Sequence, residues 1–143
     1  MSEAAPLLPA FPEFEARWAR GENGLVHARL AADLDTPVSL MLKLAGNRRD
    51  SFMLESVTGG EVRGRYSVVG MKPDLIWQCR GGESRINRQA RFDGEAYAPV
   101  PGHPLTALCA LIAESRIDMP ADLPPIAAGL FGYLGYDMIR LVE

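Results

Sequence analysis

The chain of 143 residues has the length of about one domain, and its hydrophobic fraction of 48% and charged fraction of 23% are ordinary for a globular protein. Its formal net charge of -3 offers no basic footprint for nucleic acid, and no apolar run is long enough to span a membrane. The N-terminus lacks the positive region of a secretory signal peptide. Cys79 and Cys109 are too isolated to predict a disulfide framework or a zinc site, so both are expected to be small core residues of a cytoplasmic protein.

The first part of the chain predicts a lead-in, a helix and a strand. Residues 1–10 are expected to be a mobile lead-in, and the domain itself is expected to occupy residues 11–143. Residues 25–31 alternate as a strand does, with His27 expected on the surface or rim. Between them, aromatic residues recur at helical spacing and are expected to anchor the core: Phe11, Phe14 and Trp18.

A second helix has clear start and stop signals. Thr36 supplies a hydroxyl N-cap, and Pro37 suits the first helical position. Gly46 stands where a glycine in the left-handed conformation ends many helices. The Arg48-Arg49 pair that follows is expected to belong to a solvated loop rather than to an anion site.

Residues 51–70 carry the one unusual polar feature, a predicted hairpin. Two strand-like segments, 52–54 and 64–70, flank Gly59-Gly60, which turn the chain because glycine reaches positive φ without a Cβ clash. An acid, a cation, hydroxyls and an aromatic ring are therefore expected close together, and a zwitterionic amino acid would need such groups around it. The residues are Glu55, Ser56, Arg65, Tyr66 and Ser67.

Strand alternation ranks these side chains as ligand contacts. In a regular strand Ser56 shares a face with Phe52 and Leu54, whereas Glu55 points the opposite way. Ser56 is therefore the better side-chain contact, and Glu55 would contribute mainly through its backbone unless the strand bulges. An alternative is an ordinary surface turn in which Arg65 pairs with Glu55 for about 0–1 kcal/mol; from the residues alone it is favoured by about two to one.

The following segment predicts more strands. Residues 75–80 alternate as a strand, and paired glycines predict a hairpin into a polar strand at 84–87, expected at a sheet edge or facing water. Another strand is expected near 89–92, followed by a loop at 93–101.

The last part predicts a helix and a buried strand. Pro104 opens the helix, and residues 126–136 are apolar on both faces, as a fully covered central strand is. Residues 137–143 begin another helix without a stop signal, so the chain is expected to be a fragment. No catalytic residue is predicted, because no nucleophile–base arrangement, metal motif or nucleotide loop occurs. The stripe expected to be buried on the first of these helices is Leu105, Leu108, Cys109 and Ile112.

Three segments in this order resemble the N-terminal region of anthranilate synthase component I, the large subunit. The resemblance implies that the complete enzyme, a lyase of tryptophan biosynthesis, converts chorismate to anthranilate and pyruvate. It also implies magnesium as cofactor and a glutamine amidotransferase subunit, component II, as the source of ammonia. The segments are residues 36–44, with Thr36-Pro37-Val38-Ser39 and Leu42-Lys43-Leu44; residues 52–56 with 64–67; and Gly129–Arg140, GLFGYLGYDMIR.

The same resemblance implies that the chorismate and magnesium residues belong to a C-terminal part that this chain lacks. No catalytic residue and no metal ligand are therefore expected here, and the fragment alone is expected to be inactive. The chain is expected to carry much of the allosteric site for the feedback inhibitor L-tryptophan. The residues implied are Leu54, Glu55, Ser56, Arg65, Tyr66 and Ser67.

The resemblance further implies an α+β fold, with an antiparallel β-sheet and helices packed on one side, as the N-terminal part of a two-sheet architecture. Since the missing half would complete the sandwich, an exposed apolar face and self-association through it are expected. Nucleic acid and membrane are not expected partners. Two alternatives remain open: the same region of aminodeoxychorismate synthase component I, of the folate pathway, and a non-catalytic docking module that contacts a partner subunit.

Overall fold

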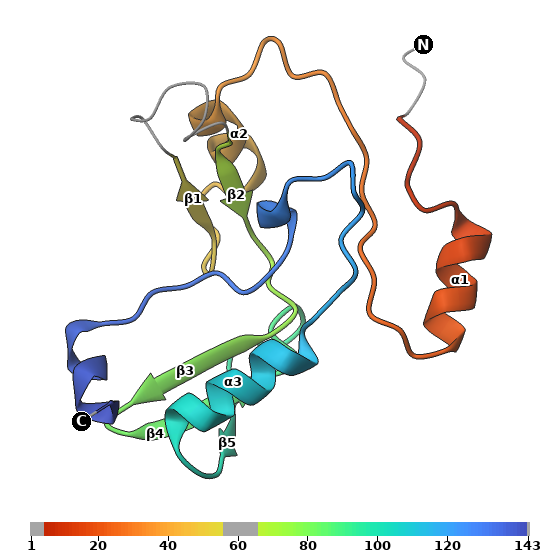
Figure 1. Cartoon of the computed structure of the whole chain (residues 1–143). Coiled ribbons are helices and arrows are strands. Elements are labelled where there is room, and N and C mark those ends of the chain that lie inside the picture. Colours follow the sequence, from red (N-terminus) through yellow and green to blue (C-terminus); the bar gives the residue numbers. More distant parts are fainter. Residues whose placement is uncertain (1–4, 56–65, 143) are drawn as a thin grey trace. The chain divides into compact units, whose positions relative to one another are not determined.

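The computed structural model describes residues 5–55 and 66–142. The chain forms two compact units: the first joins the residues up to Leu34 to Ile112–Phe131, and the second joins Asp35–Leu111 to the residues from Gly132 onward. Figure 1 shows its helices and strands. The predicted α+β class is confirmed, and the antiparallel strands are divided over a two-stranded and a three-stranded sheet.

Helix α1 (Phe11–Ala19) forms where the sequence predicts it, with proline in its first turn. The expectation that its aromatic residues anchor a core is wrong. Trp18 is 73% exposed, and none of the helix's residues is buried. Phe14 and Trp18 instead stack on each other with ring centroids 6.1 Å apart, because residues at i and i+4 share one face of a helix.

The strand predicted at residues 25–31 is reduced to one antiparallel bridge between Leu8 and His27. Their backbone groups exchange two hydrogen bonds of 2.8 Å. The His27 side chain, expected at the surface or rim, is only 13% exposed, and its Nε2 lies 3.7 Å from Oδ2 of Asp122. Arg29 donates to the same carboxylate at 3.2 Å. Asp122 thus holds the two basic side chains of this segment.

In the second unit, helix α2 (Pro37–Leu44) confirms both predicted end signals. The Ser39 N–H donates to Thr36 Oγ1 at 3.1 Å, and the Thr36 N–H donates to Ser39 Oγ at 2.9 Å. This reciprocal capping box satisfies two donors that a helix N-terminus leaves unpaired. Gly46 follows the C-cap with a φ of 53°, which glycine adopts without strain.

Asp35 reinforces the start of α2. Its carboxylate accepts hydrogen bonds from Lys43 Nζ and from Ser39 Oγ. These bonds, that from Lys43 foremost, hold the pKa of Asp35 below its usual range. The contact therefore stabilises the fold above the ordinary aspartate pKa, and the contribution is lost as the pH falls through the lowered value.

Replacement of Thr36 by alanine is expected to lower the free energy of unfolding by about 1 kcal/mol, because the Ser39 N–H loses its acceptor. Urea unfolding followed by circular dichroism would measure the loss. Thr106→Ala is the matched control, since Thr106 is exposed within a helix. Equal losses in the two variants would contradict the capping role.

The predicted antiparallel pairing of two strands is confirmed. Of the return strand expected at 64–70, residues 68–70 pair in the described part of the chain, and the turn predicted at Gly59-Gly60 lies outside the described residues. Strands β1 (Phe52–Leu54) and β2 (Val68–Gly70) pair in antiparallel register, with Phe52 opposite Gly70 and Leu54 opposite Val68. Helix α2 packs against β2, as Figure 1 shows. The hairpin ladder has three residue pairs, so its stability depends on the side chains that cover it.

The second sheet has the order β3-β4-β5 and corrects three expectations. Strand β3 (Ile76–Arg80) forms as predicted, but β4 (Glu83–Asn87) is the central strand and not an edge. Its polar side chains do not all face water: Ser84 is buried and Asn87 is 0% exposed. Residues 89–92 form a turn instead of a strand, and β5 (Ala98–Val100) lies in the predicted loop. The reason is that Asn87 closes this turn with its side-chain amide, which returns the chain alongside β4.

Helix α3 (Pro104–Glu114) forms as predicted, but its buried stripe is rotated. Pro104 and Leu111 are buried, whereas Cys109 and Ile112 are exposed. The buried positions differ from the predicted ones by a single residue at each end, and one residue turns a helix face by about 100°. The expectation that Cys109 is a core residue is wrong for the same reason.

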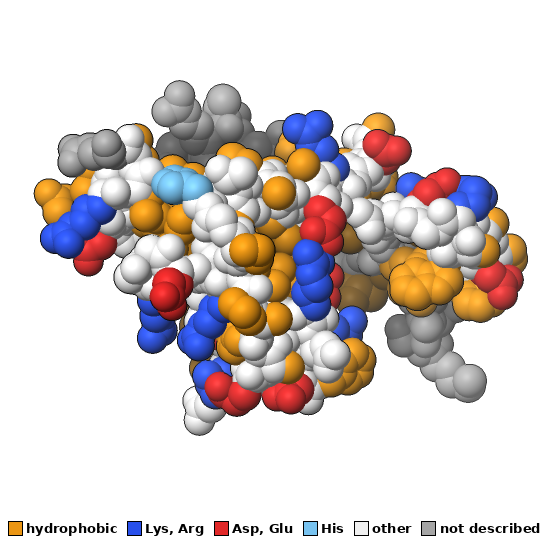
Figure 2. Space-filling view, turned by 90° about the horizontal axis from the view of Figure 1, so that it is seen from below, with side chains coloured by type: hydrophobic (Ala, Val, Ile, Leu, Met, Phe, Trp, Pro, Cys, Tyr) orange, Lys and Arg blue, Asp and Glu red, His pale blue; other side chains and the backbone are white. Residues whose placement is uncertain are grey.

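The central strand predicted at residues 126–136 is also wrong. The segment overlaps the end of the short helix η1 (Pro125–Ala127), continues without regular secondary structure and enters η2 (Tyr136–Leu141), and Tyr133 is 93% exposed. A central strand needs hydrogen-bonded neighbours on both sides, and in the described part of the chain no strand pairs with this segment. Figure 2 shows apolar side chains at the surface between charged ones. Within the described residues, no helix has the length and apolar character that a membrane crossing requires.

Candidate functional site

The described residues of the predicted ligand site gather at one end of the β1–β2 hairpin. Leu54, the last residue of β1, pairs with Val68, the first residue of β2. Glu55 directly follows Leu54, and Ser67 directly precedes Val68. Opposed residues of an antiparallel ladder have Cα atoms about 4.5–5.5 Å apart, so the ladder brings the two chain segments together here.

The side chains at this end are open to solvent. Leu54 is 49% and Tyr66 is 50% exposed, and Glu55 and Ser67 are exposed as well. A ligand could therefore reach each of them without displacing a packed core. Two further predicted site residues lie outside the described part of the chain: Ser56 and Arg65.

The described groups suit a small molecule that carries both charges. The Glu55 backbone carbonyl can accept a hydrogen bond from an ammonium group, and the hydroxyls of Tyr66 and Ser67 can donate to a carboxylate. Each charge-assisted hydrogen bond contributes about 1.5–3 kcal/mol. The exposed apolar side chain of Leu54, at this end of the strand, offers contact to an apolar part of such a molecule.

The opposite end of the hairpin is closed by a contact that sequence reasoning missed. The Phe52 ring lies over Gly70, its partner across the ladder, so closely that a Cβ at position 70 would be 2.1 Å from Phe52 Cε1. An aromatic ring over a cross-strand glycine supplies the apolar cover that glycine lacks. The sequence signal for this contact is a glycine in one strand and an aromatic residue in the other. Only the register of the ladder shows that the two residues are opposite each other.

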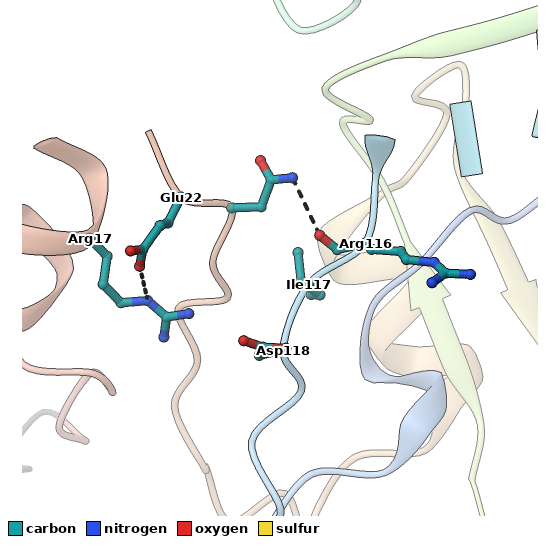
Figure 3. Close-up of a pocket in the computed structure, with 6 residues that line it drawn as sticks. Arg17, Glu22, Arg116, Ile117 and Asp118 are labelled. Carbon is teal, nitrogen blue, oxygen red and sulfur yellow. Dashed lines mark hydrogen bonds and ion pairs between the residues drawn. The ribbon is translucent and has the colours of Figure 1, made fainter. Parts of the chain in front are cut away.

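A hollow of about 350 Å³ in the first unit gathers none of the predicted site residues (Figure 3). Arg17 Nε lies 3.6 Å from Glu22 Oε2, and Arg20 also binds this carboxylate. The hydrogen bond from Arg20 holds the pKa of Glu22 below its usual range. The Arg116 side chain points away from the Arg17–Glu22 pair. The backbone carbonyl of Arg116 accepts a hydrogen bond from the Asn23 side chain. The Glu22 charge is thus already compensated within the unit.

Residues 5–55 and 66–142 contain no cluster of metal-ligating side chains. In these ranges, no group of three or more histidine, cysteine, aspartate or glutamate side chains is placed to hold a metal ion.

Comparison with known proteins gives a consistent result. The chain is 76% identical over 136 residues to "Anthranilate synthase component 1" of Cereibacter sphaeroides, an alignment that covers 95% of this chain and 27% of the relative. Proteins of the same name from Synechocystis sp. and from Neisseria meningitidis serogroup B are 37% and 38% identical, over 94% and 92% of this chain and 26% of each relative. The chain therefore spans about a quarter of the length of these curated relatives. No family model and no solved structure matches it.

Proposed function

Because the chain belongs to the anthranilate synthase component 1 family, we propose that it is the N-terminal, effector-binding part of such an enzyme. The observation that carries the proposal is the 76% identity over 95% of the chain to a protein named for this activity. The hairpin supports it further, since four of the implied effector residues meet at one of its ends: Leu54, Glu55, Tyr66 and Ser67.

The effector is L-tryptophan, a zwitterion with a large apolar ring. The Ser56 hydroxyl and neighbouring backbone carbonyls accept hydrogen bonds from its ammonium group, with Glu55 acting mainly through its backbone. Arg65, Tyr66 and Ser67 hold the carboxylate, and Leu54 contacts the ring. Inhibition then requires that tryptophan bind one conformation of the whole enzyme better than the other, since a ligand with equal affinity for both shifts nothing.

The whole enzyme converts chorismate to anthranilate and pyruvate in the cytoplasm, in the first step of tryptophan biosynthesis. Ammonia is delivered by a glutamine amidotransferase subunit, and magnesium is held by residues outside this chain. The rest of the protein covers apolar side chains such as Tyr133 and Leu134, which are exposed here. If the chain is produced alone, this surface leads to self-association. The isolated chain is expected to be inactive because the resemblance places the chorismate and magnesium residues in the remaining part of the enzyme.

The proposal is tested on the full-length protein supplied with chorismate, magnesium and ammonia. The expected product is anthranilate, and added L-tryptophan suppresses its formation. Ser56→Ala is expected to raise the tryptophan concentration for half-inhibition roughly tenfold or more, because one bond to a charged group is lost. Turnover without tryptophan is expected to stay unchanged.

Ser115→Ala serves as the control, since Ser115 lies outside the hairpin, and its tryptophan response should match that of the parent. Aminodeoxychorismate as the product would assign the chain to the folate-pathway enzyme instead. Absence of turnover would favour the non-catalytic docking module. Anthranilate formation with an unaltered tryptophan response in Ser56→Ala would keep the enzyme and reject the site.

A further inference from the structure

A second hollow, of about 200 Å³, lies in the second unit, where three loops meet. The loop before β1 contributes Arg48, Arg49 and Asp50, the turn after β2 contributes Lys72, and the turn between β4 and β5 contributes Arg91. These five charged residues, hereafter the basic hollow, come from segments up to 43 positions apart. Only the tertiary structure could bring them together.

The basic hollow has an excess of positive charge in a chain whose net charge is -3. Four cationic side chains line it with a single carboxylate, Asp50. Arg49 has an outside partner, Glu95 Oε1 at 3.3 Å, but both side chains are highly exposed and such pairs are weak. Arg48, Lys72 and Arg91 form no ion pair with any described residue. All four cationic side chains are exposed to solvent, and their mutual repulsion favours an anion between them.

Two residues of the basic hollow have an unusual backbone conformation. Asp50 has a φ of 55° and Lys72 a φ of 51°, and these are the two non-glycine residues with positive φ in the described part of the chain. Aspartate tolerates this conformation, but lysine rarely adopts it. Strain of this kind gathers at sites where the surrounding structure fixes a side chain for a purpose. Here both positions lie in loops that line the same hollow.

The turn between β4 and β5, which contributes Arg91 to the basic hollow, is held by several hydrogen bonds. The buried Asn87 donates from Nδ2 to the Asp93 carbonyl at 2.7 Å and accepts from the Gln89 N–H at 2.8 Å. The Phe92 and Asp93 N–H groups both donate to the Gln89 carbonyl at 2.8 Å. The turn that carries Arg91 is therefore ordered before any ligand arrives, which lowers the entropic cost of binding.

We propose that the basic hollow binds a small, multiply charged oxyanion through phosphate or paired carboxylate groups. Guanidinium forks match the oxygens of both groups in two-point hydrogen bonds, and Lys72 adds a point charge. The volume suits a metabolite-sized anion. The residues before β1 and after β2 lie at the opposite end of the hairpin from Glu55 and Ser67, so the occupant is distinct from tryptophan.

The test is calorimetric titration of the full-length protein with pyrophosphate and, separately, with citrate, at constant ionic strength maintained with sodium chloride. Saturable binding of one or both probes is expected, and the stronger of the two identifies the phosphate or the carboxylate source. The double variant Lys72→Gln/Arg91→Gln is expected to bind at least tenfold more weakly. Arg80→Gln, an exposed arginine of the same unit outside the hollow, is expected to bind as the parent does.

A second variant separates charge from backbone strain. Lys72→Gly removes the cation but keeps a residue that adopts positive φ freely, so the apo protein should be at least as thermally stable as the parent while anion binding weakens. Pyrophosphate or citrate should raise the melting temperature of the parent more than that of Lys72→Gly. The proposal would be overturned if the titrations do not saturate, or if the double variant binds the anions as tightly as the parent. It would also be overturned if binding depends on ionic strength alone, or if the protein binds poly-glutamate but neither small anion.

Discussion

Replacement of Gly70 by alanine is expected to lower the free energy of unfolding by about 1–3 kcal/mol. The new Cβ would lie 2.1 Å from Cε1 and 2.4 Å from Cζ of Phe52, so the ring must swing away or β1 must move. The hairpin has three residue pairs, and its other rungs offer little to absorb the change. Urea unfolding followed by Trp77 fluorescence, in a Trp18→Phe background, would measure the loss.

Two variants make this expectation specific to the Phe52 contact. Gly94→Ala places a Cβ where nothing lies within 4 Å, so its stability should differ from the parent by less than about 0.5 kcal/mol. Phe52→Leu makes room opposite position 70, so Gly70→Ala should cost clearly less in that background. If Gly70→Ala costs the same with and without the Phe52→Leu substitution, the ring contact is not the cause.

Replacement of Asn87 by alanine is expected to cost about 2 kcal/mol or more in free energy of unfolding. The side chain is fully buried and satisfies two backbone groups, the Asp93 carbonyl and the Gln89 N–H. Both hydrogen bonds are part-buried, and a buried backbone group left without a partner costs about 1–3 kcal/mol, so the two losses together are expected to reach about 2 kcal/mol. The same urea experiment measures the effect. Asn47→Ala, at an exposed loop position, should change stability by less than about 0.5 kcal/mol.

Asn87→Asp tests the same contact through pH. The carboxylate keeps the acceptor for Gln89 but loses the donor to the Asp93 carbonyl, and burial against that oxygen raises the pKa of the new side chain above about 3.9. The folded state then binds the proton more tightly than the unfolded state, so this variant should lose stability as the pH rises from about 4 through the raised pKa. A stability difference from the parent that does not change with pH would contradict the buried contact.

The local features of this chain were predictable because they depend on residues only a few positions apart. Thr36, Pro37 and Gly46 indicate helix α2 at both ends, and the structure reproduces each signal. The β1–β2 hairpin and strand β3 follow from alternation and turn residues in the same way. The family, too, is recognisable from short motifs, which the comparisons confirm.

Burial was harder to predict because it depends on what covers an element. Trp18 has helical spacing but lies exposed, and Asn87 is polar but is fully buried in a central strand. The apolar residues on both faces of 126–136 predict a central strand covered on both sides. Within the described part of the chain, however, no strand pairs with this segment. A strand's hydrogen bonds need a partner, and a sequence pattern cannot state whether that partner is present.

Local propensity and short motifs were sufficient to predict the α+β class, helices α1, α2 and α3, the pairing of β1 with β2, and the resemblance to the family. Two contacts could be seen only in the folded protein: Phe52 covers Gly70, and Arg48, Lys72 and Arg91 line one hollow. The physical reason is that each of these contacts joins residues whose proximity depends on strand register and loop closure. The spacing of residues within a single segment specifies neither the register of two strands nor which loops meet.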